Sequence, residues 1–254
     1  MAISIYNNFS DYMMFKGIKN VDVIHFECKN IEEDITEKLI IEQFGAIHGL
    51  HEKSLGFNGY LRNRLNNNTG KTIEECRISI KKLTRDMNII NRYEPKNSFE
   101  ELIDKHGKEI IERGEKCIRA AYEADYLGII TRSMRRGEIC LGNTNFQNLS
   151  KNKFIEVVSF ESCCYNMVEM DCFLLLSKLK RKGSKVDFYK MSDEFCTIEG
   201  LDEASSKFIL ALISYPYEFM KCCNRYRLGK GLLHGDRFSQ KLTKALIQDG
   251  DSLI

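Results

Sequence analysis

The sequence contains no tryptophan, two prolines and no long apolar run. A membrane-spanning helix needs roughly 18 or more consecutive apolar residues, and charged residues interrupt this chain before that length is reached. Met1 to Asn8 also lack the basic region followed by an apolar region that is typical of a secretory signal. We therefore expect a protein that is made in the cytoplasm and has no membrane partner.

The sequence also has little net charge. Its 38 basic and 36 acidic residues leave a formal charge of +2, which gives no basis for general attraction to nucleic acid or to an anionic membrane. A local basic stretch between Arg62 and Arg85 has no aromatic pattern and is interpreted as a solvated face. With 43% apolar residues in 254, the chain can bury one large core or two smaller ones. We expect a globular protein without a nucleic-acid partner.

The cysteines are not arranged as a metal site. None of the ten shows the Cys-x-x-Cys spacing that zinc sites favour, and Cys163-Cys164 and Cys222-Cys223 are adjacent pairs. A chain of this length without a secretory signal is expected to keep its cysteines reduced. We predict free thiols and no bound metal.

Phosphate-binding loops are missing as well. The sequence has no Gly-x-Gly-x-x-Gly, and the stretch Asn68-Thr-Gly-Lys-Thr72 resembles only the end of a phosphate-binding loop. The first glycine of such a loop is replaced by Leu65, and no apolar strand leads into it. This stretch is therefore not interpreted as a nucleotide site.

Long amphipathic helices are present in the middle of the chain. Apolar residues from Ile73 to Ile90 recur every three or four positions, and Pro95 ends that pattern. Ser98 to Glu101 reads as the cap of a second helix that continues to Ala121. A further helix precedes Gly137. These spacings predict core-facing helices.

The pattern is weaker before and after these helices. Met13 to Ile18 and Val21 to Cys28 are each predicted to be a strand, with a turn near Asn20. Asn30 to Glu33 reads as a capping box that opens a helix running past His51. We interpret His51 as a histidine whose hydrogen bonds are satisfied at the end of that helix.

Toward the carboxy terminus, further helices are predicted. Asp171 opens one, Thr197 begins another that stops at Tyr215-Pro216, and Phe238, Leu242 and Leu246 mark the last. His234-Gly-Asp236 matches part of a kinase loop. We reject a catalytic role for Asp236 because Lys241 stands where asparagine is required.

Residues 137 to 171 read as a strand, a loop, a second strand and a helix. This order resembles phosphotransferases of the aminoglycoside and choline kinase type. Those enzymes carry His-Gly-Asp followed by asparagine, and then a strand that ends in Asp-Phe-Asp or Asp-Phe-Glu. In such enzymes the first aspartate is the base, and the asparagine and second aspartate hold magnesium. The matching positions here are Leu141, Asn143, Asn148, Ser159 and Glu161.

Two of these replacements remove the chemistry of a phosphotransferase. Asn143 stands at the base position, and an amide does not accept a proton as a carboxylate does. Ser159 stands at the magnesium position, and a neutral hydroxyl is a poor ligand for a hard dication. We predict that Leu141 and Asn143 are degenerate and that Asn148, Ser159 and Glu161 are vestigial, with no catalytic, cofactor or metal site.

The order of motifs resembles the CotS-type spore coat family, which is kinase-like. The resemblance rests on His51-x-x-Ser54-x-Gly56, the loop 141–148, the strand to Glu161 and Tyr215-Pro216, and it covers about residues 20–248. It implies an α+β, mostly helical fold. Residues 34–254 would form a protein-kinase-like carboxy-terminal lobe, and residues 1–33 a truncated, vestigial amino-terminal lobe. In such folds an aspartate at position 171 is structural.

The same resemblance implies a function. It suggests a catalytically inactive kinase-like protein that is made in the cytoplasm, lies in the coat of the mature spore and binds other spore coat proteins. The alternative is a residual small-molecule phosphotransferase. That enzyme would use ATP and magnesium with Asn148 and Glu161, and its base would come from elsewhere.

Overall fold

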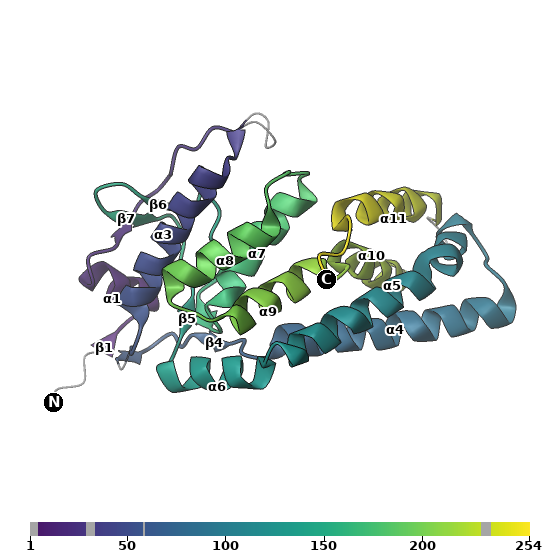
Figure 1. Ribbon diagram of the computed structural model, residues 1–254, viewed down its shortest axis with the longest axis horizontal. Coiled ribbons are helices and arrows are strands. Elements are labelled where there is room, and N and C mark those ends of the chain that lie inside the picture. The colour runs from purple at the N-terminus through teal and green to yellow at the C-terminus, as the bar shows by residue number, and fades with distance from the viewer. Residues whose placement is uncertain (1–4, 29–33, 58, 230–234) are drawn as a thin grey trace.

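The computed structural model describes residues 5–28, 34–57, 59–229 and 235–254, which form an elongated, mostly helical molecule (Figure 1). The long helices α4 (Lys71–Tyr93) and α5 (Ser98–Glu123) lie side by side along its length. No helix among these residues is long and apolar enough to cross a membrane.

The chain begins with short elements: β1 (Ile5–Tyr6), α1 (Phe9–Phe15), β2 (Lys19–Asn20), α3 (Glu37–Ser54), β3 (Tyr60–Leu61) and β4 (Asn66–Asn67). After α4 and α5 follow α6 (Tyr126–Arg136), β5 (Ile139–Cys140), β6 (Leu149–Lys151), β7 (Ile155–Val157) and β8 (Cys164–Tyr165). The remainder is helical: α7 (Glu169–Arg181), α8 (Phe188–Glu199), α9 (Glu203–Ser214), α10 (Tyr217–Leu228) and α11 (Gly235–Asp249).

Three small sheets join segments that are far apart in the sequence. In the first, β1 pairs with β3 in parallel. In the second, β7 lies between β2, which is parallel to it, and β6, which is antiparallel. In the third, β8 lies between β4, which is parallel, and β5, which is antiparallel. The second and third sheets flank the loop 141–148, because β5 precedes this loop and β6 follows it.

Buried side chains form two hydrophobic clusters. The larger includes residues from α3, α7, α8, α9 and the small sheets, and Phe44 of α3 meets Phe195 of α8 edge-on with ring centroids 5.2 Å apart. The smaller lies among α4, α5, α10 and α11 and includes Leu83 and Phe99, both fully buried. The apolar stripes of α4 and α5 supply much of this second cluster, as their spacing predicts.

The predicted amino-terminal hairpin is wrong. Met13 lies in helix α1, and residues 21–28 contain no strand. The Asn8 side chain accepts from the backbone N–H of Asp11, and the Asp11 carboxylate accepts from that of Asn8, which completes a capping box. Phe9, Tyr12 and Met13 then fall on one buried helical face. Asn20 pairs with Val157 in a sheet and does not form a turn.

Several helix boundaries also differ from the prediction. The predicted capping box at Asn30–Glu33 lies outside the described residues, and α3 begins after Thr36, whose hydroxyl accepts from Leu39 N. The cap of α5 is Asn97, one residue before the predicted Ser98. Thr197, the predicted start of a helix, lies instead in the last turn of α8, which ends at Glu199. Gly200 follows it in the left-handed conformation that favours glycine, and Asp202 then caps α9.

The packing of α4 against α5 yields a stability prediction. Leu83→Ala removes a fully buried side chain from the second cluster, and we expect the free energy of unfolding to fall by about 2–5 kcal/mol. Ile89→Ala on the same helix is the control because its side chain is 56% exposed, and we expect a change within about 0.5 kcal/mol. Urea unfolding measures both. Equal losses in the two variants would contradict this packing.

Candidate functional site

The loop 141–148 is held by a buried carboxylate on helix α7. Asp171 Oδ2 accepts from Leu141 N and Oδ1 accepts from Gly142 N, both at 2.8 Å. The Thr144 hydroxyl donates to the Asp171 backbone carbonyl at 3.0 Å. Asp171 is completely buried, and these bonds satisfy a charge that would otherwise be costly away from water. The loop therefore takes its shape from backbone contacts to α7, and the predicted structural role of Asp171 is confirmed.

His51 completes the environment of Asp171. Its Nε2 lies 2.9 Å from Asp171 Oδ2, and its Nδ1 lies 2.7 Å from Glu199 Oε1 at the end of α8. Burial lowers the pKa of His51, but the negative charges of Glu199 and Asp171 and their hydrogen bonds raise it to about 10. His51 is therefore an imidazolium that donates from both nitrogens. This agrees with the prediction of a satisfied histidine at the helix end.

Glu199 is shared with a second histidine. His48 Nδ1 lies 3.2 Å from Glu199 Oε2. Burial works against ionisation of Glu199, but the charge of His51 holds its pKa below the ordinary value. The chain of contacts from Glu199 through His51 to Asp171 joins α8, α3 and α7 beneath the loop.

Of the positions matched to kinase residues in the sequence, Leu141, Asn143 and Asn148 lie on this loop, whereas Ser159 and Glu161 follow β7. Leu141 is buried in the core, and the Asn143 side chain accepts from Asn145 Nδ2. Asn148 Nδ2 donates to Asn143 O at 2.8 Å and to Ser159 O at 3.1 Å. Ser159 N in turn donates to Asn148 Oδ1 at 2.9 Å.

These contacts give Asn148 a structural use. Both ends of its amide are bonded to backbone, so it fastens the loop to the residues after β7. The Ser159 hydroxyl accepts from Glu161 N at 3.2 Å, while the Glu161 side chain is exposed. Asn143, Asn148 and Ser159 thus form one connected network that contains no carboxylate.

A second buried ionic cluster was not predicted from the sequence. Arg132 of α6 lies 2.7 Å from Glu169 Oε2 and 3.2 Å from Glu138 Oε1. Both carboxylates are fully buried, and the Ser205 hydroxyl donates to Glu169 at 2.6 Å. Burial raises the pKa of Glu169, and the charge of Arg132 opposes that rise. Its members are far apart in the sequence and share no local motif, which is why sequence reasoning missed them.

Three potential metal ligands meet near Asp171, but their chemistry does not fit a cation. One ligand atom each of His51, Cys140 and Asp171 lies within 4.8 Å of the others. The two imidazole nitrogens of His51 are engaged by Asp171 and Glu199, and the Cys140 thiol donates to Met167 O at 3.0 Å. A metal ligand must be deprotonated, whereas burial raises the pKa of Cys140 well above its usual value. His51 and Cys140 are therefore poor ligands for a cation.

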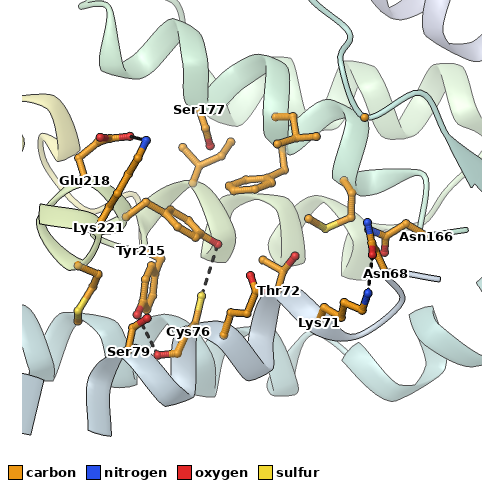
Figure 2. Close-up of a pocket in the computed structure, with 18 of the residues that line it drawn as sticks. Asn68, Lys71, Thr72, Cys76, Ser79, Asn166, Ser177, Tyr215, Glu218 and Lys221 are labelled. Atoms are coloured by element: carbon orange, nitrogen blue, oxygen red, sulfur yellow. Dashed lines mark hydrogen bonds and ion pairs between the residues drawn. The ribbon is translucent and has the colours of Figure 1, made fainter. Parts of the chain in front are cut away.

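An open cleft of about 850 Å³ lies beside the loop. Its walls come from the start of α4, from α7 and α10, and from the segment between β7 and β8 (Figure 2). Gly142 and Glu161 lie at the loop end of the cleft, and Phe173 and Tyr217 supply aromatic surface. Its volume falls within the range of about 300–1,000 Å³ that small-molecule sites occupy. No local spacing of residues signals this cleft, because several separate elements form it.

The charges along the cleft are unevenly paired. Glu218 accepts from Arg181 at 2.5 Å and lies 3.6 Å from Lys221, and Lys71 donates to the Asn68 side chain (Figure 2). Glu75 and Glu161 make no ion pair with any residue in the described part of the chain. Two carboxylates are therefore available to a ligand.

The rejected stretch Asn68-Thr-Gly-Lys-Thr72 lies at one end of this cleft. Gly70 has a φ of +82° and starts α4 without a side-chain cap, and Lys71 and Thr72 are the first residues of the helix. No glycine-rich turn precedes them, which agrees with the rejection of a phosphate-binding loop. Asp236, the other rejected residue, accepts from the Ser98 hydroxyl at 2.9 Å.

All ten cysteines are free thiols. The predicted thiols of Cys163, Cys164, Cys222 and Cys223 in the freshly made protein remain a prediction, which thiol counting under denaturing conditions would test. Nine of the ten are buried, so they serve as small core side chains.

No protein-family model matches the sequence, and no curated protein matches it. Among solved structures, the chain is similar to the crystal structure of an aminoglycoside phosphotransferase from Alicyclobacillus acidocaldarius subsp. acidocaldarius, with a TM-score of 0.63 and 12% sequence identity. The match covers 87% of this chain and 64% of that one, so this chain spans less than two thirds of its length. At this identity the likeness shows the fold, which is kinase-like and of the aminoglycoside phosphotransferase type.

The raised pKa of His51 predicts a pH dependence. Its folded-state pKa of about 10 exceeds the ordinary 6.5, so its stabilisation is fully present below pH 6.5 and is lost as the pH rises through 10. We expect His51→Gln to lower the free energy of unfolding by about 3–5 kcal/mol at pH 6, because two buried carboxylates lose their cation. The difference from the wild type should shrink toward pH 10.

Urea unfolding of both proteins at several pH values measures this difference. Contributions from the other titrating groups are the same in both proteins and cancel when the two free energies of unfolding are subtracted. A difference that stays constant from pH 6 to pH 10 would contradict a charged His51.

Proposed function

We propose that this chain is a kinase-fold protein that does not transfer phosphate and that serves as a component of the bacterial spore coat, where it binds other coat proteins. The observation that carries the first part is the network of Asn143, Asn148 and Ser159. The positions that align with a base and a magnesium ligand hold an amide and a hydroxyl, and the intervening asparagine is bonded at both ends to backbone.

The loss of catalysis follows from the chemistry of these groups. An amide nitrogen or oxygen does not take a proton from a hydroxyl near neutral pH. Magnesium neutralises the negative charge that develops on the phosphates during transfer, and a carboxylate of the protein holds the magnesium in place. The Asp171 carboxylate beside the loop is buried and bonded to Leu141 N and Gly142 N, and the Glu161 side chain is exposed to solvent. We therefore propose that the protein uses neither ATP nor magnesium as a cofactor.

The coat assignment is supported by the order of motifs along the chain. The helix that ends in His51-x-x-Ser54-x-Gly56, the degenerate loop and Tyr215-Pro216 follow the CotS-type pattern, and the kinase-like fold is compatible with it. A protein of this kind acts through its surfaces, so its partners would be other coat proteins.

The cleft favours a second candidate, a residual small-molecule phosphotransferase. It opens next to Gly142 and Glu161, so a bound molecule would lie beside the loop, and the solved structure of similar fold is named an aminoglycoside phosphotransferase. The unpaired carboxylates of Glu75 and Glu161 would suit a ligand that carries amino and hydroxyl groups. Without a base at position 143, such a ligand would be bound but not phosphorylated, which keeps the first proposal ahead.

The first proposal predicts that magnesium and ATP together do not stabilise the protein. A ligand that binds only the folded state at 100 times its Kd adds about 2.7 kcal/mol of stability. We expect no change in the thermal unfolding midpoint with magnesium-ATP, while an active aminoglycoside phosphotransferase in the same assay shifts upward. A midpoint that rises and saturates with micromolar magnesium-ATP would contradict the proposal and favour the second candidate.

The coat assignment predicts where the protein is found. Antibody detection in fractionated spores of the source bacterium should place it in the alkali- or detergent-extracted coat, with a cytoplasmic enzyme as the control for leakage. Detection only in the soluble spore interior, together with that control enzyme, would rule out a coat component.

A further inference from the structure

Two of the cysteines face each other across an antiparallel pair of strands. Cys140 of β5 and Cys164 of β8 are direct partners in the register. Asn166 N donates to Glu138 O at 3.3 Å, so Glu138 and Asn166 form a hydrogen-bonded pair two positions away. Since bonded and non-bonded pairs alternate, Cys140 and Cys164 are again a bonded pair, in which Cα atoms lie about 5.5 Å apart.

This arrangement meets the Cα spacing of a disulfide, while the Cβ atoms of a bonded pair must move closer together for the bond to close. Disulfide-bonded cysteines have Cα atoms about 4.4–6.8 Å apart, most often near 5.5–6 Å. Residues directly opposite in an antiparallel pair also place their side chains on the same face of the sheet. The Cys140 thiol donates to Met167 O, so it must rotate away from that carbonyl to meet Cys164.

A small oxidant has a route to this pair. Cys140 and Cys164 both line the cleft beside Gly142, although each side chain is at most 5% exposed. Burial raises the pKa of both thiols. At Cys164 a hydrogen bond with Asn68 and the positive charge of Lys71 oppose that rise, and Cys164 is the more exposed of the two, at 5% against 1% for Cys140. Cys164 is therefore the thiol that reacts first.

We propose that Cys140 and Cys164 form a reversible disulfide when the protein meets a small disulfide oxidant. The Cys164 thiolate attacks one sulfur of the oxidant, forms a mixed disulfide and releases one thiolate. The Cys140 thiol gives up its proton, and its sulfur then attacks the Cys164 sulfur, closes the protein disulfide and releases the second thiolate. Two protein thiols are oxidised, the oxidant is reduced to two thiols, and their protons pass to the two released thiolates.

The bond would fasten the loop end of the cleft. It closes residues 140–164 into a covalent ring that contains the whole loop 141–148 and the strands β6 and β7. Strand β8 also pairs with β4, which leads directly into α4, so the same bond anchors the segment that starts one cleft wall. The two thiols would form this bond whether or not the protein transfers phosphate.

Oxidation with glutathione disulfide, followed by trypsin digestion without reduction, tests the proposal. Cleavage after basic residues gives one peptide of residues 137–151 with Cys140 and another of residues 154–178 with Cys163, Cys164 and Cys172. We expect these two peptides to appear joined, with the loss of two hydrogen atoms, and to separate on treatment with a reductant. Titration with glutathione mixtures then gives the reduction potential of the bond.

Variants identify which thiol of the second peptide is linked. Cys163→Ser and Cys172→Ser should keep the joined peptides, whereas Cys164→Ser should lose them. Cys163→Ser is the matched control, because it removes the adjacent buried thiol. If Cys164→Ser fails to fold, fragmentation of the joined wild-type peptides shows directly whether Cys140 is linked to Cys164.

Two results would overturn the proposal. One is that residues 137–151 stay unlinked in fully folded protein at every glutathione ratio. The other is that the link persists in Cys164→Ser, or that fragmentation assigns it to Cys163 or Cys172. A bond between Cys140 and Cys164 should also raise the thermal unfolding midpoint of the oxidised protein above that of the reduced protein. The reason is that the bond lowers the conformational entropy of the unfolded chain.

Discussion

The buried carboxylate of Asp171 is the constraint on which the loop and its surroundings depend. It accepts from two successive backbone N–H groups of the loop and from His51, and His51 is held from its other side by Glu199. A charge in the core is tolerated only when it is fully paired and hydrogen-bonded. Helices α3, α7 and α8 are therefore joined to the loop through one set of charges.

This arrangement separates the shape of the loop from its chemistry. The contacts of Asp171 reach the backbone of residues 141 and 142, and those of Asn148 reach the backbone around residues 143 and 159. None of these bonds requires a carboxylate at position 143 or 159. The kinase-like fold is therefore compatible with the proposed loss of a base at Asn143 and of a metal ligand at Ser159.

The sequence predicted the parts of the fold that have long, regular patterns. The helices α4, α5 and α11 follow from apolar stripes, and the loop between two strands follows from its motif order. The amino-terminal strands were wrong because a few apolar residues fit a strand as well as a short helix, and the capping contacts of Asn8 decide between them. The division between α8 and α9 was missed because the apolar pattern continues across it. Gly200 ends α8 and Asp202 caps α9, and neither residue interrupts that pattern.

The candidate site was predicted in part, for a related reason. Asp171 and His51 were interpreted correctly as structural, but Glu199, Arg132, Glu138 and Glu169 were not identified because their partners lie far away in the sequence. The cleft and the cross-strand pair of Cys140 and Cys164 exist only once β4, β5 and β8 share a sheet. Such features depend on tertiary contacts that no local spacing encodes.

The central claim is that the loop keeps the shape of a kinase loop without its chemistry. The most direct test is a transfer assay with the purified protein, radiolabelled ATP, magnesium and a panel of small amino and hydroxyl compounds. The account predicts no labelled product and no release of phosphate above the rate in buffer. Labelled product that depends on magnesium and on the intact cleft would contradict it.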